Sequence, residues 1–167
     1  LGILVTIVGI GWITSLPSLR FYRDVTENEA NTIAPESQAI LKALKDKGKL
    51  TITTYVNLMD RYRNIGLPAS ITKDKADFDK YVRFKPDIEF KYVYYYAPTD
   101  LPHNIQKMKP NLTFEETARE IARLSRVNFN IFMNKEEIDR VVDLAPEHYR
   151  FVRFFELEDG TRSVLRI

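Results

Sequence analysis

The side chains best suited to acid–base or metal chemistry in this chain are two histidines and two adjacent pairs of glutamates. His103 lies in a proline-rich stretch, His148 precedes the C-terminal segment, and neither belongs to an H-E-x-x-H or similar ligand spacing. Adjacent residues on a helix point in different directions, so Glu115/Glu116 and Glu136/Glu137 do not predict a catalytic acid and base. No metal site follows from these residues.

Nucleophilic and phosphate chemistry have equally little support. Cysteine is absent, which excludes disulfides, thiolate nucleophiles and cysteine-based zinc sites. No G-x-x-x-x-G-K sequence occurs, so the chain is not an ATPase. Ser37 and Ser163 have no histidine at a spacing that defines a known triad, although a triad can assemble from distant positions. We therefore expect a protein that is not an enzyme and has no cofactor.

Binding chemistry has a better candidate in a run of tyrosines. Tyr92, Tyr94, Tyr95 and Tyr96, with His103 nearby in sequence, could form an aromatic platform for a glycan, a peptide or single-stranded nucleic acid. Packing of a central strand covered by helices on both faces explains the same residues. Exposure of Tyr95 and Tyr96 would favour a ligand site, whereas burial of all four rings would favour a scaffold.

The composition indicates an ordered domain without strong electrostatic attraction to nucleic acid. Charged residues make up 29% of the 167 residues, positive and negative charges are interspersed, and the net charge is only +2. A nucleic-acid-binding surface would gather lysine and arginine without so many intervening carboxylates. We expect no nucleic-acid partner.

The elements that must position these residues alternate between helix and strand. Pro35 at a first helical position and Gly48 as a stop predict a helix over 35–47. Alternation rich in β-branched residues predicts a strand over 50–56. Alternation of Ile88, Phe90, Tyr92, Tyr94 and Tyr96 with the residues between them predicts a second strand over 87–96, and a helix over 74–84 separates the two. The spacings Thr113–Glu116 and Asn134–Glu137 are typical of capping boxes and predict helices over 114–126 and 134–144, with a short extended stretch over 129–132 between them.

The C-terminal part reads as a hairpin. An Asp-Gly pair at 159–160 separates apolar runs over 150–157 and 161–167. Parallel βαβ pairing followed by an antiparallel hairpin is the order of a thioredoxin-like mixed sheet with flanking helices. The final helix of that fold is missing, which predicts that the domain is truncated at the C-terminus. Residues 57–61 take the position of the redox thiols in that fold, and without cysteine that chemistry is impossible.

The first sixteen residues, Leu1 to Leu16, carry no charge. A helix needs about 20 apolar residues to cross a bilayer, so this run predicts a membrane-helix remnant at 1–16, followed by an α/β domain at 17–167. A buried core segment remains the alternative, because apolar runs this short also occur in soluble cores.

Residues downstream of the anchor carry a resemblance to a known family. The segment 20–34, the helix ending in Ile40-Leu-Lys-Ala-Leu44 and the strand after it resemble the extracytoplasmic start of the gliding-motility type auxiliary proteins of ABC transporters. That family leaves a membrane helix, shows R-x-D-L-T and then Y-T-L-S, and continues with I-L-x-x-L. The matching residues are Arg23, Asp24, Thr26, Thr32, Ile33, Ile40, Leu41 and Leu44, and the departures are Val25, Asn31 and Ala34.

The resemblance implies a non-enzymatic component of an ABC-type transport or gliding-motility complex that acts in assembly or coupling. Its permease and ATPase would be other chains, and the domain would face the periplasm from the inner (cytoplasmic) membrane. Arg20 and Arg23, close behind the span, would instead favour the cytoplasmic side by the positive-inside rule.

Two further expectations concern partners. Arg20, Phe21, Tyr22, Arg23 and Asp24 combine arginine and aromatic residues of the types enriched at interfaces, in a position next to the membrane. We expect them to bind a partner subunit, with packing under the domain's own sheet as the alternative. The remaining functional alternative is a membrane-tethered binding module for an envelope glycan or peptide, and homo-oligomerisation stays open.

Overall fold

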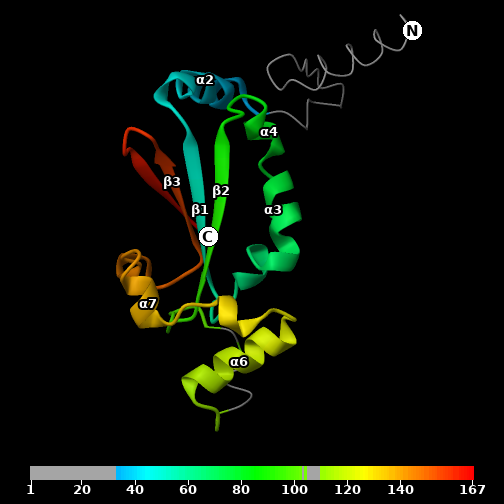
Figure 1. Ribbon diagram of the computed structural model, residues 1–167. Helices are drawn as coiled ribbons and strands as arrows, with labels where there is room; N and C mark the ends of the chain where they lie inside the picture. The colour runs from blue at the N-terminus through cyan, green and yellow to red at the C-terminus, as the bar shows by residue number, and fades with distance from the viewer. Residues whose placement is uncertain (1–32, 103, 105–109) are drawn as a thin grey trace, which may run out of the picture.

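A four-stranded mixed sheet forms the centre of the molecule, with helices on its faces and ends (Figure 1). The computed structural model describes residues 33–102, 104 and 110–167. The strands are β1 (Leu50–Asn57), β2 (Ile88–Tyr95), β3 (Val152–Leu157) and β4 (Arg162–Arg166). The expected α/β class, a mixed sheet with flanking helices, is confirmed.

The strand order in the sheet is β2-β1-β3-β4. β1 pairs with β2 in parallel, and β3 runs antiparallel to both β1 and β4. The expected hairpin is therefore present, and Gly160 in its turn has a φ of +83°, which favours glycine. β2 is an edge strand, so the expectation of a central strand covered on both faces is wrong. The place of β2 in the sheet depends on which strands pair with β1, and the sequence of β2 does not encode that pairing.

Register fixes which residues share a face. Leu50 pairs with Ile88 and with Leu157, so alternate residues from these three point to one side of the sheet. That side carries Ile52, Thr54 and Val56 from β1, Phe90, Tyr92 and Tyr94 from β2, and Phe155 and Arg153 from β3. The alternation expected for β2 is confirmed.

The helices differ in length from the sequence prediction. The helices are α2 (Pro35–Ala43), α3 (Ile71–Ala76), α4 (Asp79–Val82), α6 (Phe114–Leu124) and α7 (Lys135–Asp139). One helix expected over 74–84 is two short ones, α3 and α4, which lie along one face of the sheet (Figure 1). Short 3-10 helices occur at Lys45–Lys47, Arg63–Ile65, Pro68–Ser70, Phe129–Ile131 and Ala145–Glu147.

Both predicted capping boxes are present. Thr113 and Glu116 exchange side-chain and backbone hydrogen bonds at the start of α6, and Asn134 and Glu137 do so at the start of α7. α7 ends at Asp139, earlier than expected. The stretch over 129–132 is a 3-10 turn instead of extended, and only Met133 pairs with the edge of β2, as a single bridge to Tyr95.

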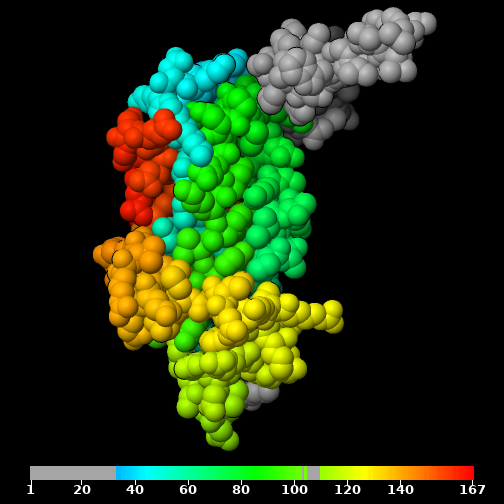
Figure 2. Space-filling view, in the orientation of Figure 1, coloured from blue at the N-terminus to red at the C-terminus, as the bar shows by residue number. Residues whose placement is uncertain are grey.

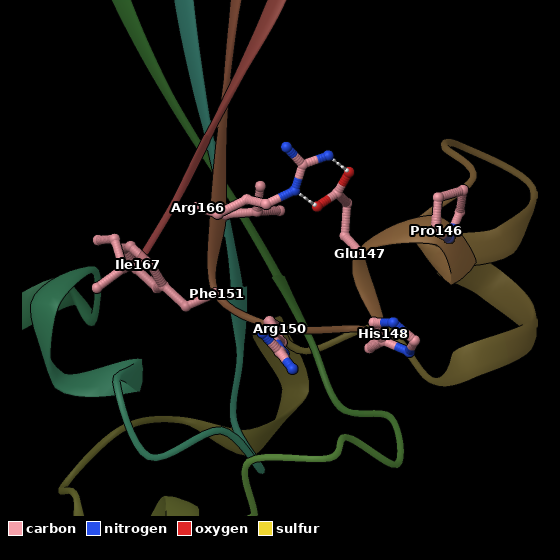
Figure 3. A pocket seen from close by; sticks show the side chains of 8 residues that line it. Pro146, Glu147, His148, Arg150, Phe151, Arg166 and Ile167 are labelled. Carbon is pink, nitrogen blue, oxygen red and sulfur yellow. Dashed lines mark hydrogen bonds and ion pairs between the residues drawn. The ribbon is translucent and has the colours of Figure 1, made fainter.

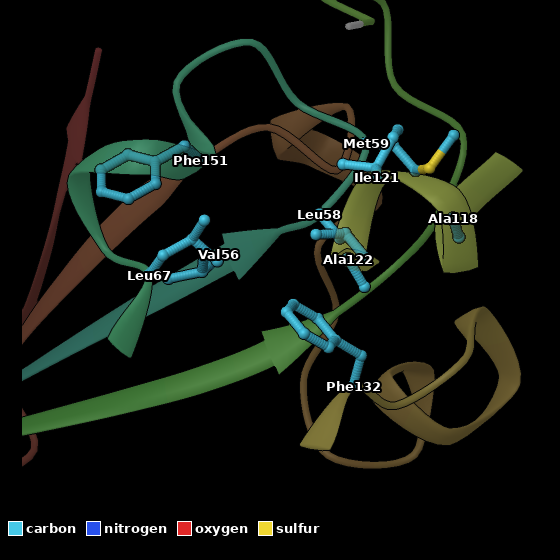
Figure 4. Packing of buried hydrophobic residues seen from close by; sticks show 9 residues of the cluster. All are labelled: Val56, Leu58, Met59, Leu67, Ala118, Ile121, Ala122, Phe132 and Phe151. Carbon is cyan, nitrogen blue, oxygen red and sulfur yellow. The ribbon is translucent and has the colours of Figure 1, made fainter. Parts of the chain in front are cut away.

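The largest buried cluster joins the carboxyl end of β1 to α6. Leu58 and Met59, directly after β1, pack with Ala118, Ile121 and Ala122 of that helix (Figure 4). Val56, Leu67, Phe132 and Phe151 complete the cluster. A second cluster around Tyr95, Ile138, Leu144 and Val152 lies on the opposite face, and a third, smaller one around Leu50, Ile52 and Leu157 lies at the other end of β1.

None of the described helices is long and apolar enough to cross a membrane. The predicted anchor at 1–16 lies outside the described residues, as does the predicted partner segment Arg20 to Asp24.

Candidate functional site

The carboxyl ends of β1 and β2 are the place to look for chemistry, because ligands in open α/β sheets bind outside the carboxyl ends of parallel strands. Three loops meet there: residues 57–63 after β1, residues 96–102 after β2, and residues 148–151 before β3. Their polar side chains decide whether this end of the sheet is available to a ligand.

Asn57, the last residue of β1, is fully buried, and both the nitrogen and the oxygen of its side-chain amide form hydrogen bonds within the protein. Its Nδ2 donates to the carbonyl oxygens of Ala97 (2.9 Å) and Tyr149 (2.7 Å). Its Oδ1 accepts from the backbone N–H groups of Met59 (3.0 Å) and Ala97 (3.2 Å). A single side chain therefore connects all three loops and has no donor or acceptor left for a ligand.

Asp60 lies one turn further along and is also fully buried. Its two carboxylate oxygens accept from the backbone N–H groups of Tyr62 (2.6 Å) and Phe151 (3.1 Å). Burial raises the pKa of Asp60, against the lowering effect of those hydrogen bonds and of nearby Arg61 and Arg150. The carboxylate thus holds the loop before β3 against the loop after β1.

Arg63 is the second buried charged residue of this loop and is 7% exposed. Its Nη1 donates to the Asp60 carbonyl oxygen at 3.4 Å, and its Nε has no hydrogen-bond partner among the described residues. Burial lowers the pKa of Arg63, and the nearby Asp60 opposes that shift. An arginine held this far inside has a packing role through its stem.

The loop before β3 is strained. His148 and Tyr149 both have positive φ values, 51° and 52°, which side chains other than glycine rarely adopt. Hydrogen bonds hold the loop in place: Arg150 forms a bidentate ion pair with Asp100, and its carbonyl oxygen accepts from the Tyr95 hydroxyl at 3.1 Å. The paired Arg150 also keeps the pKa of Asp100 below its usual range.

A small cavity of about 260 Å³ lies beside this loop (Figure 3). Arg166 from β4 donates to both carboxylate oxygens of Glu147 at its wall, at 2.6 and 2.7 Å. His148 and Arg150 also line it. Arg166 and Glu147 thus neutralise each other's charge. Among the described residues no group of three or more His, Asp or Glu side chains could hold a metal ion.

The predicted tyrosine platform is divided between the two faces of the sheet. Tyr92, Tyr94 and Tyr96 follow one face, whereas Tyr95 points to the other and is fully buried. Three hydroxyls donate internally, Tyr92 to Asp74, Tyr94 to the Gly66 carbonyl and Tyr95 to the Arg150 carbonyl. Burial raises the pKa of Tyr94 to about 12 and shifts those of Tyr92 and Tyr95 in the same direction.

The remaining platform residues add no shared surface. Tyr96 packs its half-buried ring against Phe129 and Phe114, with ring centroids 5.1 and 6.3 Å away. His103 lies outside the described residues. The tyrosines named from the sequence therefore serve packing on both sides of β2.

A buried ion pair lies between the sheet and α3. Arg153 of β3 and Asp74 of α3 are 4% and 3% exposed, and their two hydrogen bonds are 2.9 and 2.5 Å long. Tyr92 of β2 donates to the same carboxylate at 2.6 Å, and Arg153 also faces the rings of Phe78 and Phe151. This network fixes α3 on β1, β2 and β3.

A larger, apolar cavity lies on the same face as this ion pair, over the other end of the sheet. It has a volume of about 670 Å³ and lies between α2, the segment around α4, and strands β3 and β4. We call it the apolar groove. Its main apolar lining residues are Leu41, Leu44, Phe78, Tyr81, Phe155 and Leu165.

Sequence reasoning missed the residues that organise this end of the molecule. Asn57 and Asp60 follow the strand predicted over 50–56, and polar residues at that position are a usable signal. Asp74 and Arg153 are 79 positions apart, and nothing in their local sequence connects them. No protein-family model, curated protein or solved structure matches this chain.

Proposed function

We propose that this protein is a non-enzymatic component of an ABC-type transport or gliding-motility complex, acting in assembly or coupling. In this proposal residues 1–16 anchor the chain in the inner membrane and the α/β domain faces the periplasm. The permease and the ATPase are other chains. The proposal starts from the sequence resemblance over residues 20–44.

One structural observation carries the non-enzymatic part of the proposal. Asn57 and Asp60, at the carboxyl end of β1, have their side-chain hydrogen bonds within the protein. A catalytic or binding group at that position needs a free donor or acceptor directed at the ligand. The observed arrangement instead stiffens three loops, which suits a domain that presents surfaces to other subunits.

We also propose that the fold is thioredoxin-like. The strand order β2-β1-β3-β4, the parallel β1–β2 pair and the antiparallel β3 support this. The position of the redox thiols would fall on residues 57–61, which include Asn57 and Asp60. Structural side chains then occupy the place where thioredoxin-like enzymes carry out their reaction.

The segment Arg20 to Asp24 is the proposed contact with the partner subunits. The test is to tag the full chain, isolate it from its native membrane in mild detergent and identify the proteins that co-purify. We expect a permease and an ATPase with the wild-type chain, and their loss with Phe21→Ala combined with Arg23→Ala. The melting temperature of the variant should stay close to that of the wild type.

A matched control changes one apolar residue and one arginine elsewhere on the surface. Arg140→Ala combined with Val141→Ala suits this purpose, since Val141 is 61% exposed. This control should retain the partners. Absence of any transporter subunit with the wild-type chain would refute the proposed function. Retention of partners by the Phe21 and Arg23 variant would remove this segment from the interface.

A further inference from the structure

The first helix of the described chain, α2, packs little of itself into the core. None of its residues is buried, and Ile40 is 61% exposed. Ser37, Ile40, Leu41 and Leu44 follow the spacing i, i+3, i+4, i+7, so they form one stripe along the helix and the residue that caps it. Such a stripe normally faces another element. Here the described residues leave Ile40 exposed and cover Ser37, Leu41 and Leu44 only in part.

The apolar groove continues this stripe onto the sheet. Leu41 and Leu44 form its α2 side, Phe78 and Tyr81 its second side, and Phe155 and Leu165 lie beneath. Leu165 is 45% exposed although it lies on the same face as the buried core residues of β1. In the space-filling view α2 forms one end of the molecule, next to the hairpin of β3 and β4 (Figure 2).

Charges along α2 differ in sign between its two ends. Glu36 lies in the first turn and Lys42 in the last turn, and Lys45, Asp46 and Lys47 follow, so the C-terminal end keeps an excess of positive charge despite Asp46. Negative charge near the N-terminus and positive charge near the C-terminus stabilise a helix through its dipole. This distribution also makes the surface complementary to itself, because two such helices packed antiparallel bring each acidic end beside the basic end of the other.

We propose that the stripe and the apolar groove form an isologous interface with a second copy of this chain, with α2 packed antiparallel to α2 of the second copy. In an isologous contact one patch meets its own equivalent across a two-fold axis. If the axis passes between residues 40 and 41, Ile40 lies opposite Leu41 of the second copy, and Glu36 lies opposite Lys45. Ile40 then covers the mouth of the neighbouring groove.

The arrangement explains three observations together. It covers the exposed Ile40, it closes an apolar cavity that the described residues leave open, and it pairs opposite charges. A two-fold pairing through the edge of β4 is less favourable, because centring it on Val164 would place Arg162 opposite Arg166 of the second copy. The inference stands independently of the transport function proposed above.

These 167 residues contain no cysteine, so an introduced cysteine makes disulfide cross-linking a direct test. In the full chain, Ile40→Cys should give a covalent dimer under mild oxidation, since residues near a two-fold axis come within disulfide distance. Ala39→Cys, on the opposite side of α2, is the matched control and should stay monomeric. Equal cross-linking of both variants would show association through another surface and would overturn the proposal.

A charge exchange tests the register. Glu36→Lys should weaken dimerisation of the purified full chain by about three- to tenfold, because each substitution is felt twice in a two-fold dimer. Lys45→Glu with Lys47→Glu should have a similar effect, and the three changes together should restore it. Far-UV circular dichroism shows whether each variant is folded. Folded variants that all dimerise like the wild type, or a monomeric wild type, would refute the interface.

Discussion

Replacing Asp74 by alanine removes the carboxylate on which three elements converge. Arg153 donates two hydrogen bonds to it and Tyr92 a third. After the substitution the guanidinium of Arg153 remains almost fully buried. Among the described residues it keeps a long 3.5 Å contact to the hydroxyl of Thr54 and its contacts with the rings of Phe78 and Phe151. The structure therefore predicts a large loss of stability from this one change.

The magnitude follows from burial. Removing one partner of a buried ion pair leaves an uncompensated charge and costs about 3–5 kcal/mol. The exposed pair of Glu115 and Arg119 provides a matched comparison, because its shorter hydrogen bond is 2.6 Å but both side chains are more than half exposed. Glu115→Ala is expected to cost less than about 1 kcal/mol. Similar bond lengths should thus give very different energies.

Urea unfolding of the full chain, followed by far-UV circular dichroism, measures both values under identical conditions. Asp74→Ala should also lower the melting temperature by roughly 6–20 °C. The triple variant Asp74→Leu, Arg153→Met and Tyr92→Phe should regain much of the loss, since apolar residues of similar size can replace a buried ion pair. A loss for Asp74→Ala as small as that for Glu115→Ala would refute the reasoning.

Three further predictions concern other parts of the domain. Burial raises the pKa of Asp60 above its ordinary 3.8. The folded state therefore binds a proton at Asp60 more tightly than the unfolded chain does. The contribution of Asp60 to stability grows as the pH falls and is lost as the pH rises through the raised pKa. The stability difference between wild type and Asp60→Asn should therefore increase in favour of wild type from about pH 7 to about pH 4 in urea unfolding, and a constant difference would contradict this. Gly66→Ala should cost about 1–3 kcal/mol, because a Cβ there would lie 2.5 Å from Cγ2 of Val56; an unchanged urea midpoint would show that the loop moves freely. Thr113→Ala should lower stability by about 1 kcal/mol through loss of the capping box of α6, and thermal unfolding that matches the wild type would show that α6 does not need its cap.

The local features of this fold follow from the sequence. The two capping boxes, the hairpin at Gly160 and the alternation in β2 each depend on residues within one element. Hydrogen bonds and side-chain directions repeat with fixed periods over such short distances. The lengths of the helices were less predictable, because tertiary packing decides where a helix ends. The helix expected over 74–84 divides at residues 77–78, where Phe78 packs its ring against Phe90.

The sequence by itself determined the class of this protein, an alternation of helices and strands without cysteine, because periodicity and composition are properties of the chain. Only the tertiary structure decided that β2 is an edge strand, that Tyr95 is fully buried, and that Asp74 of α3 meets Arg153 of β3. It also decided that Asn57 and Asp60 direct their polar atoms inward. The physical reason is that a side chain's partners depend on strand order and register, which bring together residues far apart in the chain, whereas sequence patterns report only what lies nearby.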